Sequence, residues 1–256
     1  MNNKMPVLFV GHGSPMNAVE NNAFTRGWQA IAKKIPRPKA ILSVSAHWYT
    51  EGTRLNNLEK PQMIYDMYGF PDELYQVVYP SPGAPALVEA TQKLISREVT
   101  MDNSWGIDHG TWSVLHRIYP SADIPVYQLS IDRQASPESH YQIGQELVSL
   151  RERGILIMGS GNIVHNLARL DWQNPGGYPW ADAFDDYIQE KLLSRDDQAI
   201  INYHLAGDSA NLAFFTPEHY YPLLYVLGAS AGDRNIMPFN KASILGAISM
   251  TSYLID

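Results

Sequence analysis

Three histidines follow apolar runs that are typical of β-strands: His12 in GHGSP, His47 in SAHWYT and His165 in GSGNIVHN. Glycine on both sides of His12 allows the backbone to turn there and allows a ligand to approach the imidazole closely. Imidazole binds metal ions, and with an unperturbed pKa of about 6.5 it also serves as a general acid or base at neutral pH. Open α/β sheets place their ligand crevice at the carboxyl ends of strands, so we expect these side chains to converge.

Two further histidines occupy positions that suit a binding site. His109 lies in the glycine-containing stretch GIDHGTW, and His219 lies in TPEHYYP at the start of a predicted helix. The other three lie in stretches of helical character without a flanking glycine or a preceding strand, and we expect structural or surface roles for them: His116, His140 and His204. A single histidine is more often a core or surface residue than a ligand, so the functional inference depends on His12 and His47 together.

Short apolar runs alternate with helical patterns, and this order predicts the elements that position the histidines. The predicted strands cover residues 6–10, 40–46, 125–131 and 154–158, with one or two closing strands within 242–254. The predicted helices cover residues 22–34, 83–97, 136–151, 180–194 and 217–228. Residues 54–79 are rich in aromatic residues, Asn and Pro, and we expect a loop or short hairpin over a pocket.

This pattern predicts one α/β domain over residues 1–256. We expect a central sheet, mostly parallel or mixed, with helices on its faces. The active site is expected at the carboxyl ends of the strands, where His12 and His47 lie.

The composition favours a small-molecule partner. A net charge of -7 and a pI of about 5.6 argue against nucleic acid, because phosphate neutralisation requires clustered Lys and Arg, and the sequence has no such cluster. The chain has no cysteine, which excludes thiolate metal sites and leaves imidazole and carboxylate as metal ligands. Neither a signal-type segment nor an apolar run of about 20 residues occurs, so we expect a soluble cytoplasmic protein without membrane contact, as a monomer or small homo-oligomer.

Two glycine-rich motifs invite other interpretations. The stretch GSGN at residues 159–162 resembles a phosphate-binding loop before a helix, but it lacks the G-x-G-x-x-G fingerprint and the lysine of a P-loop. GHGSP differs from the G-x-S-x-G nucleophile elbow, because its serine follows the second glycine. The sequence therefore disfavours a dinucleotide enzyme and a serine hydrolase.

A set of imidazoles, with or without one carboxylate, suits a metal ion that keeps open coordination positions. Three protein ligands on one face of non-haem iron(II) leave room for a substrate and a small co-substrate, and the same ligands also hold zinc. Ligand type does not separate the two metals, and zinc stands above ferrous iron in the usual order of affinity. The sequence thus predicts one divalent ion per chain and leaves Fe(II) and Zn(II) open.

Five motifs, GHGSP, SAHW, DHGTW, GSGNIVHNL and TPEHYYPL, follow one another between residues 11 and 223. In this combination the chain resembles the class III extradiol ring-cleavage dioxygenases, the superfamily of the protocatechuate 4,5-dioxygenase catalytic subunit. It is most similar to the 4,5-DOPA extradiol dioxygenase branch, over nearly its whole length. The resemblance implies a catechol substrate such as DOPA, molecular oxygen, Fe(II) for activity and Zn(II) as an alternative occupant.

The same resemblance implies roles for the five histidines. His12 and His47 match the two metal ligands at strand ends, and His219 matches the third ligand. The wider superfamily often has a glutamate as third ligand, which leaves the neighbouring Glu218 as an alternative. Two more are catalytic: His165 matches the acid/base histidine and also counts among the metal ligands in the DOPA branch, while His109 lines the substrate and oxygen site and donates a hydrogen bond to an oxygen-derived anion.

Residues beside these motifs are candidates for substrate contact: Ser14, Trp48, Asn162 and Tyr220. The aromatic members suit the wall of a flat phenolic pocket. Core packing and turn formation are the alternative roles of these four residues. Asp108 is expected either to orient His109 or to cap the helix that begins near Gly110.

Two other classes of function stay open. A zinc hydrolase on the same histidines would use His165 or Glu218 as its base and would need no oxygen. A non-catalytic member of the fold would bind a small or phosphorylated ligand, although such a protein has no chemical need for five imidazoles in these motifs.

Overall fold

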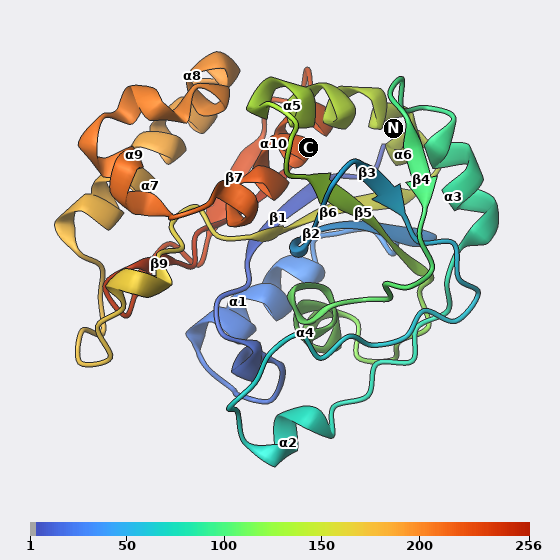
Figure 1. Ribbon diagram of the computed structural model, residues 1–256, viewed down its shortest axis with the longest axis horizontal. Coiled ribbons are helices and arrows are strands. Elements are labelled where there is room, and N and C mark those ends of the chain that lie inside the picture. Colours follow the sequence, from blue (N-terminus) through green and yellow to red (C-terminus); the bar gives the residue numbers. More distant parts are fainter. Residues whose placement is uncertain (1–3) are drawn as a thin grey trace.

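The computed structural model describes residues 4–256. Its strands are β1 (Val7–Gly11), β2 (Ala40–Thr50), β3 (Thr53–Leu55), β4 (Val99–Met101), β5 (Val126–Asp132), β6 (Ile155–Gly161), β7 (Ile236–Phe239), β8 (Ser243–Ile244), β9 (Ile248–Ser249) and β10 (Ser252–Ile255). Eight of them form one sheet in the order β4-β3-β5-β2-β6-β1-β10-β7 (Figure 1), and β8 pairs with β9. The central strands β5, β2, β6 and β1 are parallel, while β10 and β7 add antiparallel strands at one edge.

Helices cover both faces of this sheet. They are α1 (Ala23–Ala32), α2 (Asp72–Tyr75), α3 (Pro85–Gln92), α4 (His109–Ile118), α5 (Pro137–Glu146), α6 (Val148–Glu152), α7 (Pro179–Leu193), α8 (Asp197–Ile201), α9 (Asp208–Ala213) and α10 (Tyr221–Ala229). Short 3-10 turns are η1 (Pro15–Ala18), η2 (Leu167–Arg169), η3 (Tyr203–Ala206) and η4 (Pro217–His219). In Figure 1, α1, α2 and α4 lie on one side of the sheet, and α5, α6 and α10 lie on the other. This α/β architecture with a mixed sheet confirms the predicted fold class.

The apolar run of β1 serves two hydrophobic cores, one on each face of the sheet. Val7 and Phe9 belong to the core that includes the side chains of α10. Leu8 and Val10 belong to the core that includes residues of α1 and α4. Successive side chains of a strand point to opposite faces, so a central strand with helices on both sides must be apolar throughout. The apolar run therefore continues through Val10 and is followed directly by Gly11, the last residue of β1, and the polar His12.

Two predicted helix starts are capped as the sequence suggests. The Asn22 side chain accepts hydrogen bonds at the start of α1, and Thr25 completes a capping box. Ser136 caps α5, with Pro137 as its first helical residue. The predicted helix over residues 136–151 is divided at Leu147 into α5 and α6.

Two strands are longer than predicted, and this changes the setting of the site. β2 was predicted to end at Ala46, but it continues to Thr50, so that His47 lies within the strand instead of after it. The pairing of β2 with β5 shifts register between Val44 and Tyr49, an irregularity of the kind that redirects side chains. Pairing with flanking strands also extends β6, and residues 159–161 are therefore strand and not a phosphate-binding loop.

Other differences come from short elements that carry little periodic pattern. Residues 54–79 contain the end of β3 and the single-turn helix α2 as well as loop. The sequence prediction missed β4, β7, α8 and α9, which are short. The predicted helix over residues 217–228 begins as the 3-10 turn η4 and becomes α-helical only at Tyr221. Short segments of this kind form because the surrounding tertiary structure stabilises them.

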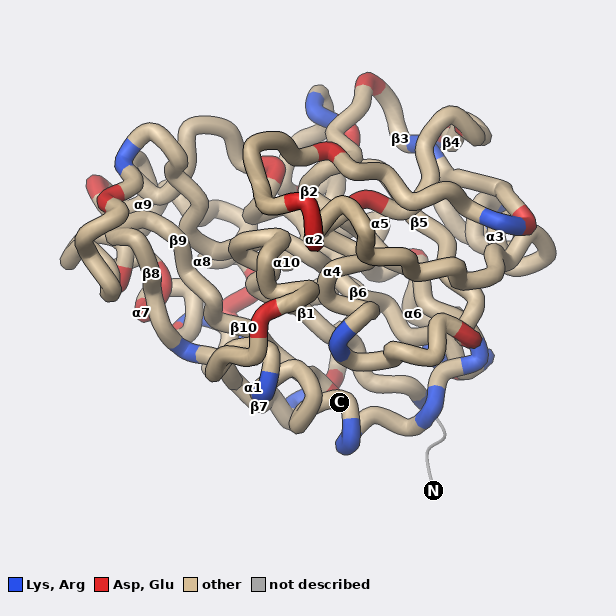
Figure 2. Tube along the Cα trace, turned by 90° about the horizontal axis from the view of Figure 1, so that it is seen from below, with Lys and Arg blue, Asp and Glu red and all other residues tan. Residues whose placement is uncertain are grey.

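Charged residues of both signs are spread along the chain. Lys and Arg occur on many elements and are interspersed with Asp and Glu (Figure 2). Among residues 4–256, no helix combines the length and the apolar composition that crossing a lipid bilayer requires.

His140 of α5 illustrates a structural role, as the sequence predicts for it. The side chain is completely buried, and its Nδ1 lies 3.0 Å from the Tyr225 hydroxyl. Burial lowers the pKa of His140 to about 4. The folded protein therefore takes up this proton only near pH 4, whereas the unfolded chain takes it up at about pH 6.5.

Between these values the unfolded state binds more protons, so the buried imidazole destabilises the fold as the pH falls below 6.5. We expect the His140→Gln variant to lose less stability than the wild type between pH 7 and pH 5, by about 2 kcal/mol. Urea unfolding at both pH values measures this difference, and other buried histidines are common to both proteins. An equal loss in the two proteins would contradict the assignment.

Candidate metal centre

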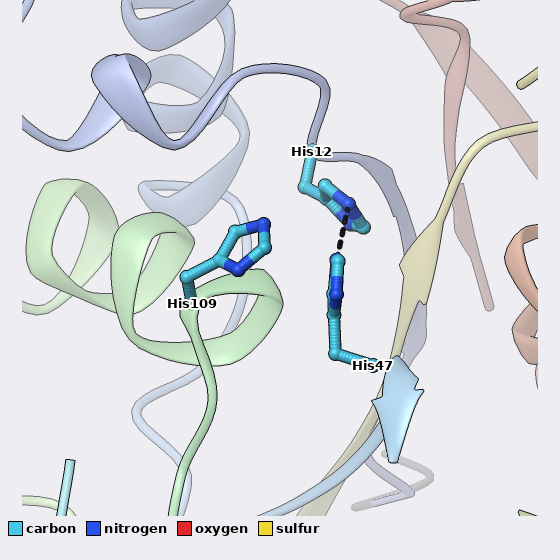
Figure 3. A group of neighbouring side chains, drawn as sticks. All are labelled: His12, His47 and His109. Carbon is cyan, nitrogen blue, oxygen red and sulfur yellow. Dashed lines mark hydrogen bonds between the residues drawn. The ribbon is translucent and has the colours of Figure 1, made fainter. Parts of the chain in front are cut away.

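The site lies where three neighbouring parallel strands, β1, β6 and β2, reach their carboxyl ends. His12 directly follows β1, and its backbone N–H donates to the Gly161 carbonyl at the end of β6. The chain then turns at Gly13, whose φ of 58° is in the left-handed region that favours glycine. His47 projects from the end portion of β2 toward His12 (Figure 3).

Nε2 of His12 and Nε2 of His47 lie 3.2 Å apart. Nδ1 of His12 lies 3.0 Å from the Ser160 hydroxyl, which donates its own hydrogen to the Gly110 carbonyl and must therefore accept from the imidazole. Nδ1 of His47 lies 3.0 Å from a carboxylate oxygen of Asp66, which also accepts. In the neutral rings both Nε2 atoms therefore carry lone pairs that face each other.

Two facing lone pairs cannot satisfy one another by a hydrogen bond, but a cation between them satisfies both. Two imidazoles on one ion at about 2.0–2.1 Å, at angles between octahedral and tetrahedral, have nitrogens about 2.8–3.4 Å apart. The observed separation of 3.2 Å between His12 and His47 falls within this range. The donor set of this pair therefore fits a divalent metal ion.

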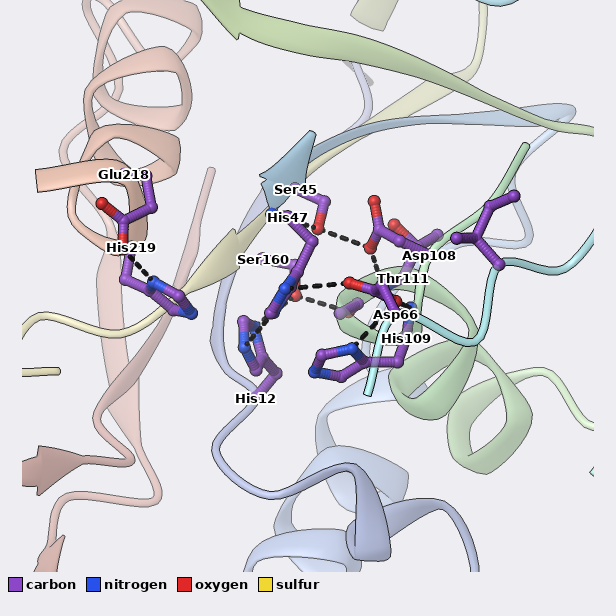
Figure 4. Close-up of polar contacts among 12 residues, drawn as sticks. His12, Ser45, His47, Asp66, Asp108, His109, Thr111, Ser160, Glu218 and His219 are labelled. Atoms are coloured by element: carbon purple, nitrogen blue, oxygen red, sulfur yellow. Dashed lines mark hydrogen bonds and ion pairs between the residues drawn. The ribbon is translucent and has the colours of Figure 1, made fainter. Parts of the chain in front are cut away.

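His109 is the first residue of α4 and reaches the same space (Figures 3 and 4). Its ring centroid lies 3.8 Å from that of His47, and its Nδ1 lies 3.0 Å from Asp66 Oδ1. Asp108, by contrast, caps α4 by accepting from the Thr111 N–H and does not orient His109. The Asp108 carboxylate also accepts from Gln128. Of the two roles predicted for Asp108, the structure has the cap.

Sequence reasoning missed Asp66, whose carboxylate contacts two of the histidines. It lies in the irregular stretch between β3 and α2, which was expected only to cover a pocket. The carboxylate is 15% exposed. The one available indication was an acidic residue in the predicted covering segment, and that segment also contains Glu59, Asp72 and Glu73.

His219 and His165 lie on the side of the His12 and His47 pair that is opposite Asp66. Their rings stack with centroids 3.5 Å apart and planes inclined by 8°. His219 Nδ1 lies 3.0 Å from Glu218 Oε1, and its buried Nε2 has no hydrogen-bond partner. The backbone carbonyl of His219 accepts from Asn162 and passes so close to Gly161 that a Cβ there would lie 2.1 Å from it.

The five predicted histidines are thus brought together, in two overlapping groups of possible ligand atoms. One group is His12, His47 and His109, and the other is His165, Glu218 and His219, with the atoms of each group within 4.8 Å of one another. The His219 ring centroid lies 5.3 Å from that of His12 and 5.1 Å from that of His47, which joins the groups into one site. His12 and His47 are the common centre of this arrangement.

A metal ion binds in the plane of an imidazole ring. Because the His165 and His219 planes are nearly parallel and are separated by close to the ring spacing of 3.5 Å, an ion in one plane lies beyond bonding distance of the other ring. In this arrangement of the rings, one ion does not lie in the planes of His165 and His219 at the same time.

The electrostatic environment keeps most of the imidazoles neutral. Burial is the largest cause, reinforced by neighbouring imidazoles, and it lowers the pKa of His165 to about 3 and the pKa values of His12, His109 and His219 below the usual range. At His47 burial also acts to lower the pKa, but the hydrogen bond to Asp66 and nearby carboxylates outweigh it and raise the pKa. Burial acts to raise the pKa of Asp66, but the hydrogen bonds from His109 and His47 hold it well below its usual range. Neutral imidazole is the form that binds metal ions.

The four predicted substrate contacts have defined places. The Ser14 side chain accepts from the Met16 N–H and caps η1. Trp48 is 3% exposed and stacks on Trp105. The Asn162 side chain donates to the Ser249 carbonyl. Tyr220 is completely buried among aromatic side chains, and its hydroxyl donates to the Ile200 carbonyl. In each case the alternative structural role is present in the fold.

Comparison with known proteins agrees with the metal-binding character of the histidine site. The family model of the catalytic LigB subunit of aromatic ring-opening dioxygenase matches residues 6–243. The 4,5-DOPA dioxygenase extradiol of Escherichia coli (strain K12) is 45% identical over 258 residues, which cover 98% of this chain and 95% of that protein. The 4,5-DOPA dioxygenase extradiol of Beta vulgaris is 36% identical over 255 residues, which cover 96% of this chain and 94% of that protein.

A solved structure shows the same fold. The crystal structure of a protein from Escherichia coli K12, described as uncharacterized, matches with a TM-score of 0.84 and 41% sequence identity, over 99% of this chain and 100% of that chain. Together these matches confirm the resemblance inferred from the five histidine motifs. The chain belongs to the family of the catalytic LigB subunit of aromatic ring-opening dioxygenases.

Proposed function

We propose that this protein opens the ring of a catechol such as DOPA by extradiol cleavage, with molecular oxygen as co-substrate and one Fe(II) ion per chain. The observation that carries the proposal is that the Nε2 atoms of His12 and His47 face each other 3.2 Å apart, with three further imidazoles around them. Family membership and relatives named 4,5-DOPA dioxygenase extradiol support the reaction type.

His12, His47 and His219 are the proposed metal ligands. The buried Nε2 of His219 has no other partner, and its Nδ1 is held by Glu218, so the ring presents a lone pair to the site. Glu218 Oε1 contacts the Nδ1 of His219, and its buried Oε2 has no hydrogen-bond partner, so the Glu218 carboxylate is the alternative ligand on this side. The near-parallel stacking of His165 on His219 supports a role for His165 as acid/base and not as a second ligand on that side.

His12, His47 and His219 would hold the ferrous ion, which would supply the electron transfer between the diol and oxygen. His165, neutral because burial lowers its pKa to about 3, accepts a proton from a catechol hydroxyl. The resulting imidazolium returns the proton to the leaving oxygen later in the reaction.

His109 presents a hydrogen-bond acceptor to the site, whereas the family resemblance implies a donor. Its Nδ1 hydrogen is donated to Asp66, so the neutral ring presents Nε2 as an acceptor toward the site. We propose that His109 accepts a hydrogen bond from the second catechol hydroxyl, and that it donates only after it has taken up that proton.

The decisive test is an oxygen-uptake assay with metal-depleted protein reloaded anaerobically with Fe(II). We expect uptake of oxygen with DOPA or another catechol, in an amount equal to the yellow ring-opened product formed. The Zn(II)-loaded protein should show neither, because zinc does not pass electrons to oxygen. Product release without oxygen would instead indicate a zinc hydrolase, and a chain that binds neither metal would indicate a non-catalytic member of the family.

A further inference from the structure

Asp66 is the only residue outside the histidine motifs that contacts two imidazoles of the site among the hydrogen bonds and ion pairs of residues 4–256. Its Oδ1 lies 3.0 Å from Nδ1 of His109 and also accepts from the backbone N–H of His109 at 3.0 Å. Its Oδ2 lies 3.0 Å from Nδ1 of His47. One carboxylate therefore bridges a histidine of β2 and a histidine of α4 (Figure 4).

The backbone around Asp66 is held firmly enough to fix this bridge. The Ile64 N–H donates to the Ile107 carbonyl at 2.8 Å, and the Trp112 indole N–H donates to the Ile64 carbonyl at 2.9 Å. Tyr65 donates its hydroxyl to the Val77 carbonyl at 2.6 Å. The first two contacts attach residue 64 to residues in and just before α4, and the third joins two parts of the covering segment, residues 54–79, to each other. The Asp66 carboxylate therefore reaches the imidazoles from a defined position.

The bridge determines the tautomer of both rings. An ionised carboxylate only accepts hydrogen bonds, so the hydrogen of each imidazole must be on Nδ1 where it contacts Asp66. The lone pair of each ring is then on Nε2. Since the His47 and His109 ring centroids are 3.8 Å apart, both lone pairs are presented to the same small space. No other tautomer of His47 keeps a free Nε2 opposite His12.

We propose that Asp66 is a positioning residue that couples the metal ligand His47 to His109 by fixing both in the Nδ1–H form. The metal-binding part of this inference rests on the geometry of the pair His12 and His47, and the part that concerns turnover rests on the proposed function. Asp108, which precedes His109 in sequence, does not share the role, because its carboxylate serves the α4 cap and the Gln128 side chain.

The test substitutes Asp66→Asn, which keeps the size of the side chain but offers one acceptor and one donor group. The amide can satisfy one imidazole as before, and it forces the other to lose its hydrogen bond or change tautomer. We expect the affinity for Zn(II), measured by competition with a chromophoric chelator, to fall about 10- to 100-fold. Asp72→Asn, in the exposed first turn of α2 in the same segment, is the matched control and should leave the affinity unchanged.

A double variant separates the two arms of the bridge. In the His109→Ala background, Asp66→Asn should still weaken Zn(II) binding, because that effect acts through His47. In the same background, Asp66→Asn should lower the rate of the Fe(II)-saturated enzyme only slightly further, because the effect of Asp66 on turnover acts through His109, which is already absent. Equal Zn(II) affinity for the wild type and Asp66→Asn, in variants that retain the wild-type circular dichroism spectrum, would overturn the proposal.

One measurement on the unaltered protein guards against a variant that does not fold. Long-range ¹H–¹⁵N NMR spectra of the metal-depleted wild type should assign the Nδ1–H tautomer to both His47 and His109. The Nε2–H tautomer at either residue would refute the inference. Neither this spectrum nor the Zn(II) affinity depends on ring cleavage, so a failed oxygen-uptake assay would reject the proposed function without deciding the role of Asp66.

Discussion

Replacement of His12 or His47 by alanine is expected to abolish stoichiometric metal binding and, with it, oxygen-dependent ring cleavage. The two Nε2 atoms lie 3.2 Å apart and face each other, so removal of one leaves the other imidazole as an isolated donor. Changes to residues that merely orient ligands lower metal affinity about 10- to 100-fold, and loss of a ligand itself should exceed that. Metal content after dialysis and oxygen uptake with a catechol measure the two losses.

The same experiment identifies the third ligand. His219→Ala should lose the metal and His109→Ala should retain it, since His219 has a buried Nε2 without a partner on the wall opposite Asp66. His204→Ala, a substitution at an exposed histidine of η3, is the control and should match the wild type. Full metal content in the His12→Ala, His47→Ala double variant would refute the ligand assignment. Loss of metal in His109→Ala with retention in His219→Ala would give the third position to His109.

Replacement of His165 by glutamine is expected to lower kcat by roughly 10²- to 10⁴-fold while metal content stays at the wild-type level. Glutamine offers hydrogen bonds but does not titrate, so it removes proton transfer and keeps polar contact. The nearly parallel His165 and His219 planes, with centroids 3.5 Å apart, allow one of these two rings to bind an ion in its plane. Steady-state oxygen uptake with Fe(II)-saturated enzyme, alongside metal analysis of the same sample, measures both quantities.

A parallel loss of metal and turnover in His165→Gln would show that His165 is itself a ligand. A rate equal to that of the wild type would remove it from the chemistry altogether. His140→Gln is a useful companion, because that histidine is also buried and has a pKa lowered to about 4, yet it lies in α5 against Tyr225. Its turnover at neutral pH should equal that of the wild type, which separates the consequences of losing a buried imidazole from those of losing a reacting one.

Much of the architecture could be predicted from local sequence. The run Val7–Val10 is apolar at every position because β1 packs on both faces, and this marks a central strand. Asn22 and Ser136 mark helix starts because their side chains satisfy free N–H groups within the next few residues. Apolar runs and helix caps of this kind depend on residues that are close in sequence, so they can be predicted from the sequence alone.

Strand ends were less predictable. His47 was expected to follow a strand, but β2 continues past it because β5 provides partners for Tyr49 and Thr50. β6 likewise continues through Ser160, whose hydroxyl then becomes the acceptor for His12. A strand extends as far as the neighbouring strands provide backbone hydrogen-bond partners. Those strands lie far away in sequence, so a local pattern does not predict where the strand ends.

The histidine motifs by themselves determined which residues gather at the site and, through their order, the family to which the chain belongs. Only the tertiary structure decided how each imidazole is oriented. Asp66 could not be distinguished from other acidic residues of its segment, and Tyr220 could not be distinguished from a pocket residue, until the packing assigned one to the imidazoles and the other to the core. The physical reason is that a side chain's chemical type is local, whereas its hydrogen-bond partner, and hence its tautomer and the direction of its lone pair, depends on groups brought near it only by folding.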